Sequence, residues 1–268
     1  MIRSFFQRLR AKLSARPSLP LERLRRAAER GEADAQYSLG QAYLQGSATE
    51  LRQVANAPRS AVNWLELAAR QGHVEAQHSL SLIYLHGARA GGATATWFAE
   101  TQRAQAARAN AELLFPEGME IEAMPERAFA LAMAAAVRGH AAAQANLGML
   151  FLRGVGCEQD FSAAAVWFRR AAEKGDAGGA LGLGLIYEHG FERAPDWAEA
   201  ARWYAIAAEA GNDAAATALG MLHLNGQGLA RDIAKAERLL RGPAARGNPF
   251  AQKALANLRS LHSPTTAA

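Results

Sequence analysis

Cysteine is nearly absent from this 268-residue chain, which has only Cys157. A single thiol excludes an intramolecular disulfide and a zinc site built from several cysteines, so we expect neither a disulfide-stapled secreted domain nor a zinc finger, and favour a reducing compartment. Long apolar runs are lacking as well. The longest, residues 128–137, has ten residues, whereas a membrane span needs about 18 to 20. The sequence therefore predicts no transmembrane helix.

Aromatic residues are scarce too, at 7%, although half of the residues are hydrophobic. Burial must then come mainly from Ala, Leu and other small side chains, a composition that favours helices packed on helices. Charged residues make up 21% of the chain, which indicates a folded protein rather than a disordered one.

Positive charge is concentrated at one end. Residues 1–30 contain nine Arg or Lys and two Glu, a net charge of +7, which leaves −2 for residues 31–268 of a chain whose total is +5. A nucleic-acid-binding repeat protein needs a basic track along its length. The nearly neutral body supplies none, so we expect no nucleic-acid partner.

The chain repeats itself with a period of 36 residues, marked by one glycine in each copy. Each marker glycine is preceded by an Ala-rich pair and followed by a small residue at position 4 and a Leu at position 8, where position n means n residues after the marker. The markers are Gly31, Gly72, Gly139, Gly175, Gly211 and Gly247. The apolar positions recur at helical spacing and predict a helix A after each glycine, and no repeat buries its apolar stripe alone.

A second helix is predicted in each repeat after a polar loop. Helix A is expected to end at a glycine that adopts the left-handed conformation, at Gly46, Gly87, Gly154, Gly190 and Gly226. Asp160, Asp196 and Asp232 then stand where an N-cap is needed for helix B. The expected architecture is an all-α, α/α superhelical solenoid of about six 36-residue repeats over residues 20–262, with a flexible tail at 263–268.

The segment 154–175 carries the most informative pattern. Its two loop glycines, Asp160, the pair Trp167-Phe168 and the marker Gly175 resemble the Sel-one-like repeat, a relative of the tetratricopeptide repeat. The segment 226–236 repeats the match. The resemblance implies an α/α superhelix that binds other proteins and organises complexes, often in bacterial envelope or signalling pathways.

A partner is expected in the concave groove, on the face of helix A opposite the buried stripe. Positions 6 and 10 share that face because they lie four residues apart. The candidate partner-binding residues at these positions are Tyr37, His78, Leu82, Met149, Leu181, Leu185 and Met221. Within this set, Leu82, Met149, Leu181, Leu185 and Met221 form an apolar trough for a helix or extended segment. The alternative is that superhelical curvature or the insertion buries these side chains.

Residues 1–19 form a basic amphipathic segment without acids. Its apolar face consists of Ile2, Phe5, Phe6, Leu9 and Leu13. Such a helix suits contact with an anionic membrane surface. A transit peptide and a frayed tail or extra capping helix remain alternatives.

The second repeat is interrupted by about 31 extra residues, within 88–124. A helix is predicted inside this insertion, because the stretch from Trp97 to Phe115 precedes the helix-ending Pro116 and Gly118. It is expected either to cover the groove as a lid or to pack outside as a brace.

No constellation for catalysis is recognisable among the seven histidines and 25 acidic residues. We expect no enzyme, no cofactor and no metal site, and a structural or surface role for the histidines. The prediction is a bacterial, cytoplasmic, non-catalytic scaffold for protein–protein interaction. A membrane-surface adaptor anchored at the inner membrane by residues 1–19 is the alternative, and an uncharacterised enzyme or RNA binder comes third.

Overall fold

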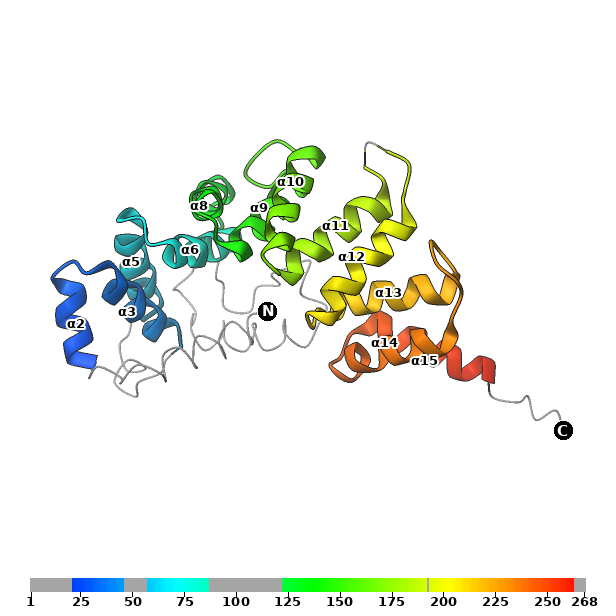
Figure 1. Ribbon diagram of the computed structural model, residues 1–268. Helices are drawn as coiled ribbons and strands as arrows, with labels where there is room; N and C mark the ends of the chain where they lie inside the picture. Colours follow the sequence, from blue (N-terminus) through cyan, green and yellow to red (C-terminus); the bar gives the residue numbers. More distant parts are fainter. Residues whose placement is uncertain (1–20, 46–56, 87–121, 192, 263–268) are drawn as a thin grey trace. The chain divides into compact units, whose positions relative to one another are not determined.

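A computed structural model describes residues 21–45, 57–86, 122–191 and 193–262 (Figure 1). Within these ranges every regular element is an α-helix, which confirms the all-α prediction. The helices are α2 (Leu21–Glu29), α3 (Ala33–Gln45), α5 (Ala57–Arg70), α6 (Val74–His86), α8 (Pro125–Val137), α9 (Ala141–Arg153), α10 (Phe161–Glu173), α11 (Ala177–His189), α12 (Trp197–Glu209), α13 (Asp213–Asn225), α14 (Ile233–Ala245) and α15 (Pro249–His262). Residues 1–19, the tail at 263–268 and most of the insertion, to residue 121, lie outside the described residues.

The described residues form two compact units. The N-terminal unit contains α2, α3, α5, α6 and α8, the start of α9 up to Ala143, and residues 155–157. The C-terminal unit contains α9 from Gln144 and then α10 to α15. Within each unit, helices that follow one another in the sequence pack together, as α3 does on α5 and α11 on α12.

The helices alternate as the 36-residue period predicts. Those that follow a marker glycine are the A helices: α3, α6, α9, α11, α13 and α15. Those that precede a marker glycine are the B helices: α2, α5, α8, α10, α12 and α14. The chain therefore has five A–B pairs among its described residues, with the single B helix α2 before them and the single A helix α15 after them.

The marker glycines end the B helices. All six have positive φ, between 77° at Gly175 and 93° at Gly31. The amide after each glycine donates to a carbonyl five residues back, as Asp176 N does to Ala171 O at 3.0 Å. This is the Schellman arrangement, in which a glycine reverses the chain and the last helical carbonyls gain donors.

The junction from A helix to B helix also follows the prediction. Gly154, Gly190 and Gly226 have φ of 65°, 60° and 68°, whereas Gly46 and Gly87 lie outside the described residues. The expected N-caps are confirmed: Asp160, Asp196 and Asp232 accept the amide hydrogen three residues on, at 2.7, 3.0 and 2.8 Å.

Core packing depends on glycines in the A helices that lie against large B-helix side chains. A Cβ on Gly148 at position 9 of α9 would lie 2.7 Å from the ring of Phe168 on α10, and one on Gly184 in α11 would lie 2.3 Å from Tyr204 on α12. Gly40 and Gly220 approach Leu65 and Leu240 in the same way. These four large residues are fully buried. Because the glycine at position 9 has no side chain, a ring or branched side chain of the B helix fills the space beside it.

The second glycine of the loop after an A helix also has a packing role. Gly156 and Gly228 have φ of 72° and 70°. A Cβ on Gly156 would lie 2.1 Å from Pro125 O, at the start of the preceding B helix, and one on Gly228 would lie 2.2 Å from the Trp197 carbonyl carbon. These glycines therefore let each loop touch the first turn of the preceding B helix.

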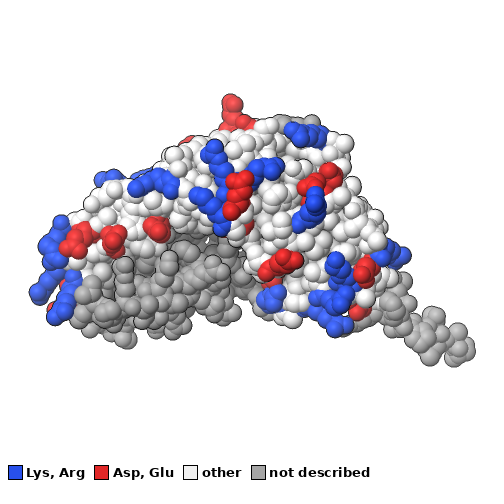
Figure 2. All heavy atoms as spheres, viewed as in Figure 1, with Lys and Arg blue, Asp and Glu red and all other residues white. Residues whose placement is uncertain are grey.

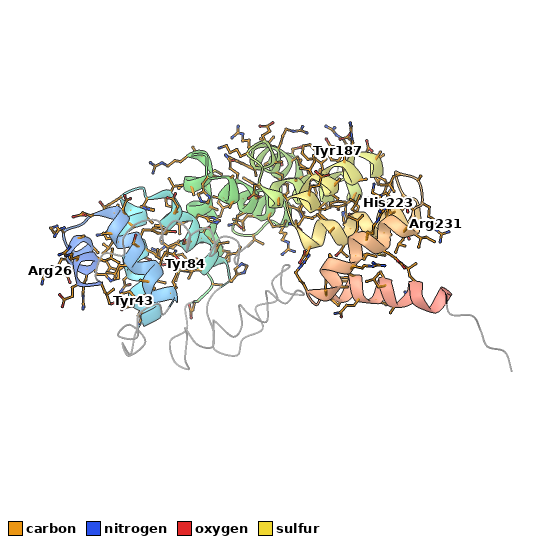
Figure 3. All side chains as sticks on the ribbon, turned by 60° about the horizontal axis from the view of Figure 1, so that its bottom comes forward. Arg26, Tyr43, Tyr84, Tyr187, His223 and Arg231 are labelled. Carbon is orange, nitrogen blue, oxygen red and sulfur yellow. The ribbon has the colours of Figure 1, made fainter. Side chains whose placement is uncertain are left out.

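After the insertion, the chain rejoins the repeat pattern at the N-cap of the B helix. In uninterrupted repeats the N-cap amide donates to the carbonyl of position 12, as Asp196 N does to Tyr187 O at 2.8 Å. Met124 N donates to Tyr84 O at 2.7 Å in the same way, and α8 begins at the next residue. Figure 3 shows Tyr84, Tyr187 and His223, the position-12 residues of α6, α11 and α13. Unlike the aspartates, the Met124 side chain makes no cap hydrogen bond.

We predict that Gly228→Ala destabilises the protein by about 1–3 kcal/mol more than Gly211→Ala. Both positions have positive φ, so both variants carry backbone strain. Only at Gly228 does the new methyl group meet backbone atoms, since nothing lies within 4 Å of a Cβ on Gly211. Chemical denaturation of the two variants checks this, and equal losses would show that the loop does not press against α12.

We predict that Met124→Asp stabilises the protein by about 0.5–2 kcal/mol, because α8 gains the N-cap acceptor that α10, α12 and α14 already have. Thermal unfolding measures the gain. Met124→Ala is the control and is expected to give none; a gain of the same size in this control would mean that removal of the exposed Met, rather than capping, is responsible.

Candidate functional site

The candidate residues at position 6 lie in the core. Tyr37, His78 and Leu181 are 8%, 6% and 3% exposed. Leu181 belongs to the buried cluster that also contains Tyr204 of α12 and Leu219 of α13, which joins its own repeat to the next one. Tyr37 packs in the cluster that contains Val62 and Leu65 of α5. An A helix inside the stack has neighbours on two sides, which buries position 6.

The candidate residues at position 10 are partly open to solvent. Leu82, Met149 and Leu185 are half-buried, and Met221 is 37% exposed. Leu82 belongs to the N-terminal unit, whereas the other three belong to the C-terminal unit, on α9, α11 and α13. We call Met149, Leu185 and Met221 the apolar row.

Small side chains precede the apolar row on α11 and α13, whereas the corresponding residue of α9 is Asn146. Gly182 and Ala218 lie three residues before Leu185 and Met221, which is about one helical turn. Towards the helix ends the surface becomes polar, with Arg153, His189 and Asn225 exposed four residues after the row. Desolvation lowers the pKa of Arg153. The C-terminal unit therefore carries three partly exposed apolar side chains at the repeat period, each followed four residues later by an exposed polar one.

Histidine rings form two contacts between successive repeats in the N-terminal unit. Each contact joins position 6 of one repeat to the residue after the next marker glycine, and we call it a joint. Tyr37 at position 6 stacks on His73, with ring centroids 4.5 Å apart, and His78 at position 6 of the next repeat lies 4.6 Å from His140. His73 and His140 follow marker glycines and act as N-caps: their Nδ1 atoms accept the amides of Ala76 and Ala143, at 3.2 and 3.1 Å. Sequence reasoning gave these histidines a structural or surface role without locating the joints.

His78 is the most perturbed of the ionisable groups in these joints. Burial, with a smaller contribution from His140, lowers the pKa of His78 to about 3. Its Nδ1 is buried without a hydrogen-bond partner. The ring is therefore neutral at physiological pH.

A glutamine at position 5 ties A helices to the preceding B helix. Nε2 of Gln36, Gln77 and Gln252 donates to the carbonyls of Ala28, Ala69 and Ala244, at 3.1, 3.2 and 2.9 Å. Sequence reasoning missed this contact. The signal was the recurrence of Gln at position 5 in four copies.

The two tyrosines with the strongest pKa shifts have structural partners. The hydroxyl of Tyr84 donates to Glu66, which also accepts from Arg127 at 2.7 Å, and that of Tyr204 donates to Glu188. Burial, followed by the hydrogen bond to the glutamate, raises the pKa of each tyrosine above its ordinary value. Both hydroxyls stay protonated as donors, so neither is prepared to act as a base or nucleophile.

Metal and charge chemistry give no other site among the described residues. No group of three or more His, Cys, Asp or Glu is placed there to hold a metal ion, and Cys157 is half-buried and not part of a disulfide. On the described surface that faces the viewer in Figure 2, Lys and Arg are interspersed with Asp and Glu. No helix in the described ranges is long and apolar enough to cross a membrane.

The chain belongs to the Sel1 repeat family. The family model matches residues 33–73, 74–94, 141–176, 177–212 and 213–241, more than half of the sequence. These matches correspond to the repeats that the marker glycines define. The fold is accordingly an α/α superhelical repeat of the Sel1 type, and Sel1 repeat proteins generally mediate protein–protein interactions.

Solved structures agree with this assignment. A protective antigen of uropathogenic Escherichia coli with an SLR fold is 29% identical, with a TM-score of 0.66 over 91% of this chain; the chain spans 44% of that antigen. A Sel1 repeat protein from Oxalobacter formigenes is 26% identical, with a TM-score of 0.67, over 87% of this chain and 78% of its own. A Sel1 repeat protein from Klebsiella pneumoniae, 18% identical with a TM-score of 0.50 over 90% of this chain and all of its own, shares the fold. No curated protein matches the chain significantly.

We predict unequal losses of stability from truncating two leucines one turn apart on α11. Leu181→Ala is expected to cost about 2–5 kcal/mol of unfolding free energy, because Leu181 is buried between α12 and α13. Leu185→Ala, at the half-buried position 10, is expected to cost less than about 1.5 kcal/mol. Denaturant titration compares them, and a larger loss at Leu185 would place the apolar row in the core.

Proposed function

We propose that this protein is a non-catalytic scaffold that holds a partner segment on its A-helix face, with the apolar row of the C-terminal unit as the principal contact. The observation that carries the proposal is the placement of Met149, Leu185 and Met221 at 36-residue intervals on three A helices, each partly exposed. Repetition at the repeat period makes a strip rather than scattered apolar residues, and apolar strips on a protein surface mark interaction sites.

The chemistry of the row favours an apolar segment as its ligand. Methionine side chains are flexible and polarizable, so they adapt to partners of different shape. Leu82 offers the same chemistry at position 10 of α6, in the N-terminal unit. Tyr37, His78 and Leu181 serve the proposal indirectly, because they are buried and fix the A helices that carry the exposed residues.

The variant Met149→Asp/Leu185→Asp tests the proposal in a pull-down from the native organism. It is expected to lose at least tenfold of the protein captured by the wild type, because carboxylates cannot be buried against an apolar segment. The matched control is Val166→Asp/Ile206→Asp, which places two carboxylates at apolar residues of α10 and α12 that are 50% and 48% exposed. The control is expected to capture as the wild type does.

Thermal unfolding accompanies this comparison. Both double variants are expected to melt within a few degrees of the wild type, since all four positions are partly or largely exposed. Unchanged capture by the Met149/Leu185 variant contradicts the proposal. So does an equal loss in the control, because the surface of α10 and α12 would then bind as strongly as the apolar row.

We propose a second candidate function, in which residues 1–19 bind an anionic membrane surface and hold the protein on the cytoplasmic side of the inner membrane. The supporting observation is the sequence pattern alone: an apolar face that includes Phe5, Phe6 and Leu9 beside five Arg or Lys and no acid. Flotation with vesicles containing anionic lipid, with and without residues 1–19, tests it. Equal flotation of the two proteins removes this candidate.

A further inference from the structure

We propose that the His78–His140 pair makes the packing of α6 against His140, the residue just before α9, acid-sensitive, so that mildly acidic pH loosens the N-terminal unit at this place while the corresponding contacts of the C-terminal unit persist. This inference goes beyond the proposed function. It does not depend on it, because its readout is a property of the protein without a partner.

The geometry of the joint leaves little room for a proton. The two rings lie 4.6 Å apart at an interplanar angle of 35°, and His78 is 6% exposed. Protonation would bury a positive charge without water and set it against a second ring that also titrates. Nδ1 of His140 accepts the Ala143 amide, so a proton there would remove the N-cap of α9 and add positive charge at a helix N-terminus, where it is unfavourable.

The charged groups on neighbouring elements do not compensate. Among the described residues, His140 is the ionisable group whose charge acts on His78. On α5, which packs against α6 as α8 does, Glu66 is engaged with Tyr84 and with Arg127 of α8. Arg138, just after α8, donates to the carbonyl of Gly72. On α6 itself, Glu75 lies 3.4 Å from His73. The proton is therefore accommodated by opening the joint.

The other joints provide an internal comparison. Tyr37 stacks on His73, but Asp34 and Glu75 each lie 3.4 Å from a ring nitrogen of that histidine, so its charged neighbours are carboxylates and not a second imidazole. In the C-terminal unit no histidine occupies the equivalent positions, which are held by Ala145 and Asp176, Leu181 and Asn212, and Thr217 and Asn248. Asn212 accepts from Ala215 N at 3.0 Å. An asparagine cap does not titrate. Acid sensitivity is therefore expected at one joint rather than throughout.

The direction and the size of the change in the opening constant with pH follow from proton linkage. The open form binds a proton at the ordinary histidine pKa of about 6.5 and the closed form at about 3, so opening becomes more favourable as the pH falls below 6.5. Between pH 7.5 and pH 5.0 the opening constant should rise about 30-fold from His78 alone. Stability at this joint is fully present above pH 6.5.

Amide hydrogen exchange of the full chain, corrected for the intrinsic effect of pH on the exchange rate, tests the proposal. In the wild type, protection in Val74–His86 is expected to fall about 30-fold between pH 7.5 and pH 5.0. Protection in Trp197–Glu209, a helix without histidine, is expected to change by less than threefold. Equal changes in the two helices, or no change in Val74–His86, overturn the proposal.

Two variants separate this joint from a general effect of acid. His78→Leu/His140→Asn reproduces the Leu181 and Asn212 pair and should hold the change in Val74–His86 below threefold; His78→Leu alone should act in the same direction if the double variant folds poorly. His73→Asn is the matched control and should keep the 30-fold loss. Persistence of the loss in both His78 variants, or its disappearance in His73→Asn, contradicts the assignment to His78 and His140.

Discussion

The close approach between glycines of the A helices and large side chains of the B helices is the constraint on which the rest of the fold depends. Phe168 illustrates it from both sides, because its ring lies against Gly148 of α9 and against Gly182 of α11, where a Cβ would come within 2.7 and 2.3 Å. One ring thus connects the A helix of its own repeat with that of the next. With so few aromatic residues in the chain, this arrangement lets a single ring in a repeat serve two interfaces.

The second repeat lacks both the glycine and the large side chain, and this paired difference supports the interpretation. There the B-helix position that corresponds to Phe168 is Ala132, and position 9 is Ser81 instead of glycine; both are fully buried. A small B-helix residue leaves room for a side chain on the A helix, so the two positions have changed together within one chain. This is the same repeat that carries the insertion, although the Met124–Tyr84 hydrogen bond preserves its junction.

Sequence reasoning predicted the features that depend on local chemistry. The period, the left-handed glycines and the aspartate N-caps follow from backbone conformations that each residue type favours, and the structure has them at the expected residues within the described ranges. The candidate site was harder to predict from the sequence, because position 6 and position 10 look equivalent on an isolated helix. Only the placement of a helix between two neighbours shows that Leu181 is buried whereas Leu185 is half-exposed. The histidine joints were not predictable for the same reason, since His78 and His140 are 62 residues apart and meet only through packing.

The most direct test of this account is the effect of Gly148→Ala on the free energy of unfolding, measured in the wild type and in a Phe168→Ala background. Replacing a mid-helix glycine by alanine normally stabilises by about 0.5–1 kcal/mol. The account predicts the opposite sign in the wild type, because the methyl group meets the Phe168 ring, and a return to stabilisation once that ring is removed. A stabilising effect in the wild type, or the same loss in both backgrounds, would contradict it.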